Sequence, residues 1–167
     1  MTRELEPAEL ASLVRSLRTA TTAAEVEVVG PRTSLILLRR GRAFGRVDFA
    51  FYPFDPVGRR TRWRGLVVES LEDMTVNKLQ AVLTRNQPRD FVDLYFLLRE
   101  GPLRDLGELL DLVRAKFDTA SHPVGLAARL LIARELRELP RMLRRVTKAE
   151  LAAFFELRAR ELVTLEP

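Results

Sequence analysis

The stretch of sequence that decides the fold is VESLEDMTVNKLQAVLTRNQPRDFVDLY, residues 68–95. Its first part predicts a helix, because Ser70 and Asp73 have capping-box spacing and apolar side chains then recur at intervals of three and four residues. We expect this helix to end near Asn86. A second helix is expected to begin at Pro88, since proline suits a first helical turn, and to stop at the Gly-Pro pair further on.

The chain before this stretch has the periodicity of strands, and the chain after it has that of helices. An amphipathic helix is predicted over residues 7–19. The strands are expected at 26–29, 34–38, 47–52 and 66–68, and the later helices at 103–117, 123–138 and 147–163. Strands first and helices second indicate an α+β fold with a helical C-terminal half.

The composition excludes several function classes. The 167 residues contain no cysteine and one histidine, so thiolate zinc sites, disulfides, cysteine nucleophiles and histidine-based triads are ruled out. Arg or Glu interrupts the longest apolar stretches, and the first seven residues are polar and acidic, which excludes a membrane span and a secretory signal. We therefore expect a cytoplasmic protein with no membrane partner, whose chemistry relies on Asp, Glu, Lys, Arg, Ser or Thr.

The charge balance favours a phosphate-bearing partner. The formal net charge is +5, and an excess of this kind attracts nucleic acids and nucleotides. Arginine is densest at Arg39-Arg40-Gly41-Arg42 and over residues 59–64, which lie between predicted strands. The alternative is that the arginines pair with glutamates on exposed helix faces.

Two features upstream of the second helix suggest chemistry. Asp48 lies in an otherwise apolar strand, where a carboxylate must be paired, bind a metal or face a cleft; an open edge strand is the alternative. Lys78 and Arg85 are seven residues apart and so on one helix face, where two cations in line can hold a triphosphate. The alternative for this pair is a solvated basic stripe.

A third feature is a pair of carboxylates one helical turn apart, Asp90 and Asp93. The helix dipole explains an acid in the first turn, and this accounts for Asp90. Asp93 lies among apolar neighbours in sequence, so we expect it to be buried beside a cation such as Lys78 or Arg85.

Together these motifs resemble the second half of the AbiEii/AbiGii nucleotidyltransferase toxin family, found in type IV toxin–antitoxin and abortive-infection systems. The pattern is S-x-E-D at a helix start, then K-x-x-A-x-x-x-R, then R-D-x-x-D-L-Y, and residues 70–95 match it at each of those positions. The strand around Asp48 is similar to the strand before this block in the family. The resemblance covers residues 10–100.

The resemblance implies a nucleotidyltransferase fold, a mixed sheet flanked by helices, with a partial nucleotidyltransferase-like domain over 1–100 and a helical region over 101–167 packed on it. It implies transfer of a nucleotide from an NTP to an RNA (tRNA) or protein acceptor with Mg²⁺, and a cognate antitoxin as partner.

The resemblance also implies roles for single residues. Asp48 is expected to bind the metal or accept a proton, and Lys78 and Arg85 to grip the phosphates. Asp90 and Asp93 are expected to orient these cations or complete the site; Asp93 is counted with Asp48 and Lys78 as catalytic. The role implied for Arg89 is contact with a nucleic-acid backbone.

The chain departs from the family at its start. The family's first two metal ligands follow Gly-Gly or Gly-Ser in an Asp-x-Asp motif, whereas no Asp precedes Asp48 here. We expect a shortened copy or a chain whose natural start lies upstream. Two other hypotheses remain: an inactive relative that binds RNA or an antitoxin, and a structural protein in which Asp93 and Lys78 form only an ion pair.

Overall fold

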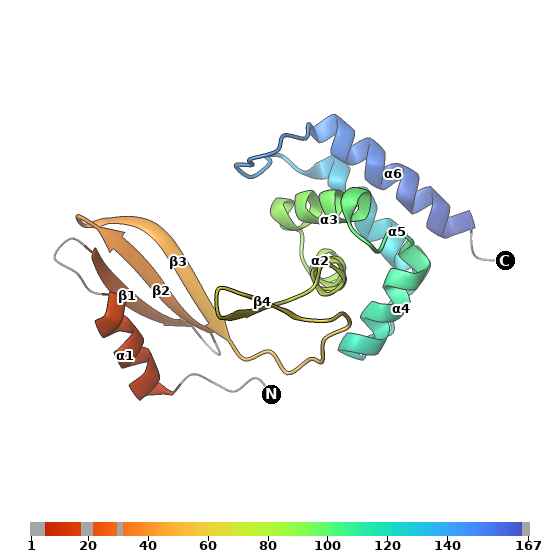
Figure 1. The fold of residues 1–167 in the computed structure, drawn as a ribbon. Coiled ribbons are helices and arrows are strands. Elements are labelled where there is room, and N and C mark those ends of the chain that lie inside the picture. Colours follow the sequence, from red (N-terminus) through yellow and green to blue (C-terminus); the bar gives the residue numbers. More distant parts are fainter. Residues whose placement is uncertain (1–5, 18–21, 30–31, 165–167) are drawn as a thin grey trace. The chain divides into compact units, whose positions relative to one another are not determined.

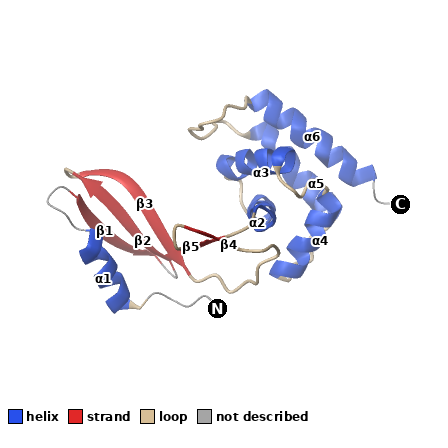
Figure 2. Ribbon diagram, viewed as in Figure 1, coloured by secondary structure: helices blue, strands red, loops and turns tan. Residues whose placement is uncertain are grey.

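The computed structural model describes residues 6–17, 22–29 and 32–164 (Figure 1). The chain packs as two compact units, Met1–Pro53 and Phe54–Pro167. The boundary that the sequence suggested near residue 100 lies inside the second unit. Helices and strands are both present, as Figure 2 shows, so the predicted α+β class is confirmed.

The first unit is one helix and a three-stranded sheet. Helix α1 (Pro7–Leu17) precedes β1 (Thr22–Val29), β2 (Arg32–Arg39) and β3 (Arg42–Ala50), which pair in the order β1-β2-β3. All pairings here are antiparallel. The expected mixed sheet is therefore wrong for the described strands, because consecutive strands joined by short turns pair antiparallel. Of the predicted helix 7–19, positions 18 and 19 lie outside the described residues.

The second unit begins with a short hairpin and continues as helices. Its elements are β4 (Thr61–Trp63), β5 (Leu66–Val68), α2 (Leu71–Thr84), α3 (Pro88–Glu100), α4 (Leu106–Phe117), α5 (Pro123–Leu131), the 3₁₀ helix η1 (Ile132–Glu135) and α6 (Lys148–Thr164). The predicted helices at 71–86, 88–100 and 147–163 are confirmed. The helix predicted over 123–138 ends earlier, and a 3₁₀ turn replaces its last part. The helical backbone ends at Leu136, which is extended.

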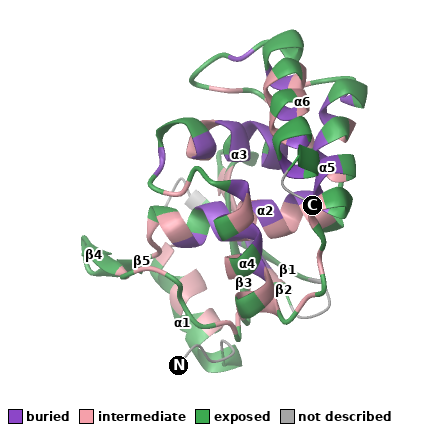
Figure 3. Ribbon diagram, turned by 90° about the vertical axis from the view of Figure 1, so that its right-hand side faces the viewer, coloured by how far each residue is buried: buried purple, intermediate pink, exposed green. Residues whose placement is uncertain are grey.

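The core of the second unit lies between α2, α3 and the later helices (Figure 3). Leu79 of α2 and Leu94 of α3 are fully buried. The rings of Phe91 and Phe155 meet edge to face with centroids 5.7 Å apart, which joins α3 to α6. Within the described residues, no helix has the length and apolar character that a membrane span requires.

Candidate phosphate-binding site

The site residues that the sequence singled out on α2 and α3 lie together. Lys78 projects from the middle of α2, and Arg85 is the residue that ends α2, with φ −150° and ψ 157°. Pro88 then starts α3, after Gln87 takes the extended backbone typical of a residue before proline. This short connection places the start of α3, and with it Asp90, beside the C-terminal half of α2.

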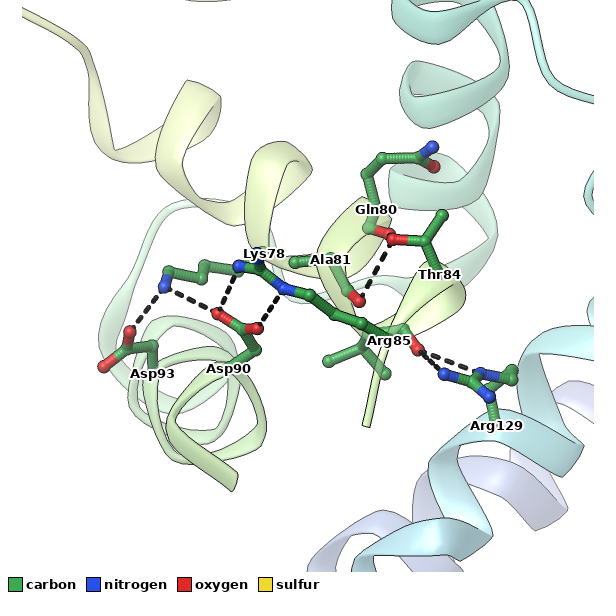
Figure 4. A network of polar contacts seen from close by, with 9 residues as sticks. Lys78, Gln80, Ala81, Thr84, Arg85, Asp90, Asp93 and Arg129 are labelled. Carbon is green, nitrogen blue, oxygen red and sulfur yellow. Dashed lines mark hydrogen bonds and ion pairs between the residues drawn. The ribbon is translucent and has the colours of Figure 1, made fainter. Parts of the chain in front are cut away.

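Asp90 is the centre of the cluster and is fully buried (Figure 4). Its Oδ1 accepts from the Lys78 ammonium at 3.0 Å and from Arg85 Nη2 at 3.2 Å, while its Oδ2 accepts from Arg85 Nε at 2.7 Å. Lys78 Nζ also lies 2.6 Å from Asp93 Oδ2. We call these four residues, Lys78, Arg85, Asp90 and Asp93, the α2–α3 ion cluster.

The two cations keep Asp90 ionised. Burial would raise the pKa of this carboxyl, but the hydrogen bonds and charges of Arg85 and Lys78 outweigh burial and hold the pKa below its ordinary value. A buried carboxylate with two cationic donors is a fixed anchor, so it sets the direction in which Lys78 and Arg85 point.

Exposure separates the two carboxylates. The side chain of Asp93 is 48% exposed, whereas that of Asp90 is 0% exposed. The expectation that Asp93 is the buried acid is therefore wrong. Neighbours in a helical sequence point in different directions, so the apolar residues on either side of Asp93 do not cover it. Its predicted cation, Lys78, is confirmed.

Arg129 of α5 holds α2 from the other side. Its Nε and Nη2 both donate to the Val82 carbonyl, at 2.9 and 2.8 Å, near the C-terminal end of α2 (Figure 4). Carbonyls in the last turn of a helix have no intrahelical partner, and a guanidinium there also suits the helix dipole. Arg129 therefore fixes the end of α2 from which Arg85 extends.

The other two predicted residues differ from each other in setting. Arg89 is exposed in the first turn of α3, and no hydrogen bond or ion pair to another described residue holds it. Asp48 lies on β3 in the first unit, where its Oδ1 accepts from Ser34 Oγ at 2.6 Å and from Arg46 Nε at 2.7 Å. These hydrogen bonds, Ser34 first, lower the pKa of Asp48.

Comparison with known proteins agrees with this pattern. A family model described as nucleotidyl transferase AbiEii toxin, type IV TA system, matches residues 11–164. The chain belongs to this family. The AbiEii match runs well past the motif block and takes in α6, whereas the sequence resemblance covered residues 10–100. No curated protein and no solved structure matches the chain.

The AbiEii assignment implies a metal ion, because nucleotidyltransferases generally depend on one. The residues that the structure describes do not form a binding site for such an ion. No group of three or more acidic or histidine side chains among them is arranged to hold a cation, and the carboxylates of Asp48 and Asp90 already bind guanidinium or ammonium groups. Carboxylates neutralised in this way are poor ligands for Mg²⁺.

The S-x-E-D part of the AbiEii pattern is structural in this chain. Ser70 caps α2 by accepting from the Asp73 amide at 3.1 Å. The Asp73 carboxylate is fully buried and accepts from the Val57 and Gly58 amides, from Ser70 Oγ, and from Lys116 Nζ of α4 at 2.6 Å. Sequence reasoning identified the cap and missed Lys116, because a contact across 43 positions leaves no local signal.

Burial would raise the pKa of Asp73, but its four donors, Lys116 foremost, lower it to about 2. Every oxygen of this carboxylate is occupied, so Asp73 joins the start of α2 to α4 and to the loop at 57–58. The Asp73 carboxylate therefore has no lone pair left for a ligand. Its role is to anchor α2, the helix that carries Lys78.

Proposed function

We propose that this AbiEii protein binds the triphosphate of an NTP with Lys78 and Arg85 and takes part in transferring the nucleotide to an RNA acceptor. The observation that carries the proposal is the double anchoring of these two cations on the buried carboxylate of Asp90. Preorganised cations aimed by a fixed anion are what phosphate recognition requires.

Both cations retain donors for a ligand. The Lys78 ammonium has three N–H groups, and its partners among the described residues are Asp90 and Asp93. The Arg85 guanidinium has five, and it uses Nε and Nη2 on Asp90. The Arg85 side chain is 49% exposed, which leaves its outer edge open to an incoming phosphate.

Asp93 is the replaceable member of the cluster. An ion pair with a half-exposed partner contributes at most about 1 kcal/mol, because water competes for both charges. A triphosphate carries more charge than one carboxylate and therefore displaces Asp93 from Lys78. Asp90 cannot be displaced in the same way, since no solvent reaches it.

In the proposed reaction, a hydroxyl of the acceptor attacks the α-phosphorus of the NTP. The new bond is the oxygen–phosphorus ester, the α–β anhydride bond breaks, and pyrophosphate leaves with the electron pair of that bond. The proton of the attacking hydroxyl passes to a base. Lys78 and Arg85 hold the leaving phosphates and offset the charge that gathers on them. The proton-accepting role of Asp48 stays a prediction, and an Asp48→Asn variant tests it by loss of transfer; a metal-binding role does not fit, because Arg46 already pairs with this carboxylate.

Family membership also supports two partners. A nucleotide substrate and a cognate antitoxin are what a toxin of a type IV system implies, and we propose that both meet the protein in the cytoplasm, where NTPs and RNA are found. The exposed Arg89 beside the cluster is proposed to contact the acceptor backbone.

Nucleotide binding by the whole chain tests the proposal, measured by calorimetry at fixed ionic strength. Lys78→Met is expected to weaken NTP binding about tenfold or more, as loss of a charged hydrogen bond predicts. Asp93→Asn is expected to tighten it several-fold, since the competing carboxylate is gone. Arg160→Gln is the matched control, because Arg160 is an exposed α6 arginine whose partner is Glu156.

The opposite signs separate binding from folding. If Lys78 and Asp93 are only structural, both variants lower the unfolding temperature and neither changes NTP affinity. That result, or a wild-type chain that binds no NTP, overturns the proposal. Transfer is measured separately, as incorporation of labelled nucleotide into RNA.

A second candidate function is binding without transfer. It is favoured by the absence of a metal-binding group among the residues that the structure describes. Under this alternative the chain binds RNA or its antitoxin, and no labelled nucleotide reaches any acceptor. The affinity for NTP does not decide between this alternative and transfer.

A further inference from the structure

Two of the β-hairpins, β2–β3 and β4–β5, end in the same kind of turn. Arg40 and Gly41 join β2 to β3 with φ of 52° and 74°, and Arg64 and Gly65 join β4 to β5 with φ of 48° and 83°. Two positive φ values define a type I′ turn, whose first position favours Asn, Asp or Gly. Arginine is disfavoured there, because a left-handed backbone brings its Cβ close to the following carbonyl oxygen. The same disfavoured residue therefore occupies the tip of each hairpin.

Each tip also stacks a guanidinium on an exposed aromatic ring. Arg64 lies over the Trp63 ring with its Cζ 4.8 Å from the centroid, and Arg39 lies over Phe44 at 4.8 Å. Trp63 is 59% exposed and Phe44 is 52% exposed. Both rings lie near the end of a hairpin and outside the buried core.

The β4–β5 hairpin has an apolar face and a basic one. Residues opposite each other in an antiparallel pair share a face, so Trp63 lies with Leu66, and Arg62 lies with Val67 on the other side. All six strand residues are exposed (Figure 3). A two-stranded ribbon of this length contributes little stability by itself.

Charge decides which partner suits this ribbon. Residues 56–68 contain four arginines and no acid, which favours a polyanion. An acidic protein would satisfy the arginines, but it offers the exposed Trp63 ring no planar partner besides the Arg64 guanidinium that already stacks on it. Unpaired nucleotides supply both groups, because each carries a phosphate and a base that stacks on an aromatic ring.

We propose that the β4–β5 hairpin binds unpaired RNA nucleotides, with a base stacked on Trp63 and the adjacent phosphates on the arginines of residues 59–64. The choice of RNA rests on the proposed function, since RNA is the acceptor there. Two residues separate Val68 from the start of α2, and the hairpin and the α2–α3 ion cluster lie in one compact unit. The RNA strand that binds the hairpin is the acceptor of the proposed nucleotide transfer.

Trp63 is the only tryptophan of the chain, so its fluorescence reports on this surface alone. The experiment titrates the full chain, without NTP, with a short single-stranded RNA, an abasic RNA of equal length and the corresponding single-stranded DNA. We expect the RNA to quench Trp63 emission and the abasic strand to bind with little quenching. Equal quenching by the abasic strand, or tighter binding of the DNA than of the RNA, overturns the proposal.

Variants give a second readout, the affinity for labelled RNA measured by anisotropy. Trp63→Ala is expected to weaken RNA binding at least about fivefold. Arg64→Gln, beside Trp63 at the hairpin tip, is expected to lower the slope of log affinity against log salt by about 0.7, the value for one phosphate contact on a single strand. Trp63 and Arg64 are exposed, so neither variant threatens the fold, and unchanged affinity and slope overturn the proposal.

Two results distinguish this inference from the proposed function. Quenching by RNA with no nucleotide transfer means that the hairpin binds RNA and the transfer proposal fails. Transfer to RNA without quenching, and with Trp63→Ala as active as the wild type, means that the acceptor binds elsewhere and the hairpin proposal fails.

Discussion

Replacing Lys116 with methionine tests how much the buried Asp73 anchor contributes to stability. The Lys116 side chain is 2% exposed and that of Asp73 is 0% exposed, with 2.6 Å between Nζ and Oδ1. Removing one partner of a buried ion pair costs about 3–5 kcal/mol, since the other charge stays buried. The Val57 and Gly58 amides and the Ser70 hydroxyl still hold the carboxylate. We therefore expect the unfolding free energy to fall by about 3 kcal/mol, the low end of that range.

The pH dependence of that loss follows from the pKa of Asp73. A pKa lowered from 3.8 to about 2 corresponds to roughly 2 kcal/mol of stability. Because the folded pKa is depressed, this stability is present above about pH 5 and is lost as the pH falls toward 2. Of the groups that lower the pKa of Asp73, Lys116 has the largest effect. The difference in unfolding free energy between Lys116→Met and the wild type must therefore narrow as the pH falls through the same range.

The assay is urea unfolding followed by far-UV circular dichroism, at pH 7 and at pH 3. Lys148→Met is the control, because Lys148 is exposed and its ammonium donates only to the Arg137 carbonyl; we expect a change under about 0.5 kcal/mol. The reasoning is refuted if Lys116→Met unfolds with the wild-type free energy at pH 7. It is also refuted if the loss is as large at pH 3 as at pH 7.

Three further predictions concern the helices around the site. Asp90→Asn is expected to lower NTP affinity about tenfold in calorimetry, because both cations lose their charged anchor; unchanged affinity contradicts this. Arg129→Leu removes both hydrogen bonds to the Val82 carbonyl and is expected to cost about 1–3 kcal/mol of unfolding free energy in urea, with wild-type stability as the contrary result. Gly101→Ala places a Cβ within 2.4 Å of the Leu97 carbonyl oxygen, so its unfolding temperature should drop by several degrees, and an unchanged one would disprove the clash.

The helices of the second unit follow closely from local signals. Ser70 was expected as a cap and is the residue before α2, and Pro88 was expected at the first turn of α3 and is there. Both signals act within one helical turn: a hydroxyl accepts a nearby amide, and the proline ring presets φ. Such rules need no knowledge of distant residues, which is why they locate helix starts well.

The tertiary contacts of the site could not be predicted in this way. Lys116 reaches Asp73 across 43 positions, and Arg129 reaches the Val82 carbonyl across 47. Their sequence signals are an ordinary lysine and arginine on helix faces. Only the packing of α4 and α5 against α2 determines that these side chains turn inward, and packing depends on the whole set of apolar faces.

The two carboxylates of R-D-x-x-D show the same limit more sharply. Composition around Asp93 indicated burial, yet the helix turns Asp90 inward and Asp93 outward. Both acids contact Lys78. The three-residue spacing places them one helical turn apart, so that a single cation on α2 can reach both. Which acid is a fixed anchor and which one a ligand can displace depends on exposure, a property of the folded unit.

The AbiEii motif block therefore contains two classes of residue with different consequences for chemistry. Asp73 and Asp90 are buried and have their oxygens occupied, so they position helices and side chains. Lys78 and Arg85 are partly exposed and keep donors for phosphate oxygens. Under the proposed function, Lys78 and Arg85 bind the triphosphate, whereas both carboxylates of the α2–α3 ion cluster, Asp90 and Asp93, are paired with a cation. The proposed nucleotide binding therefore rests on the two cations of this cluster, whereas the proposed transfer also needs an acidic group outside it.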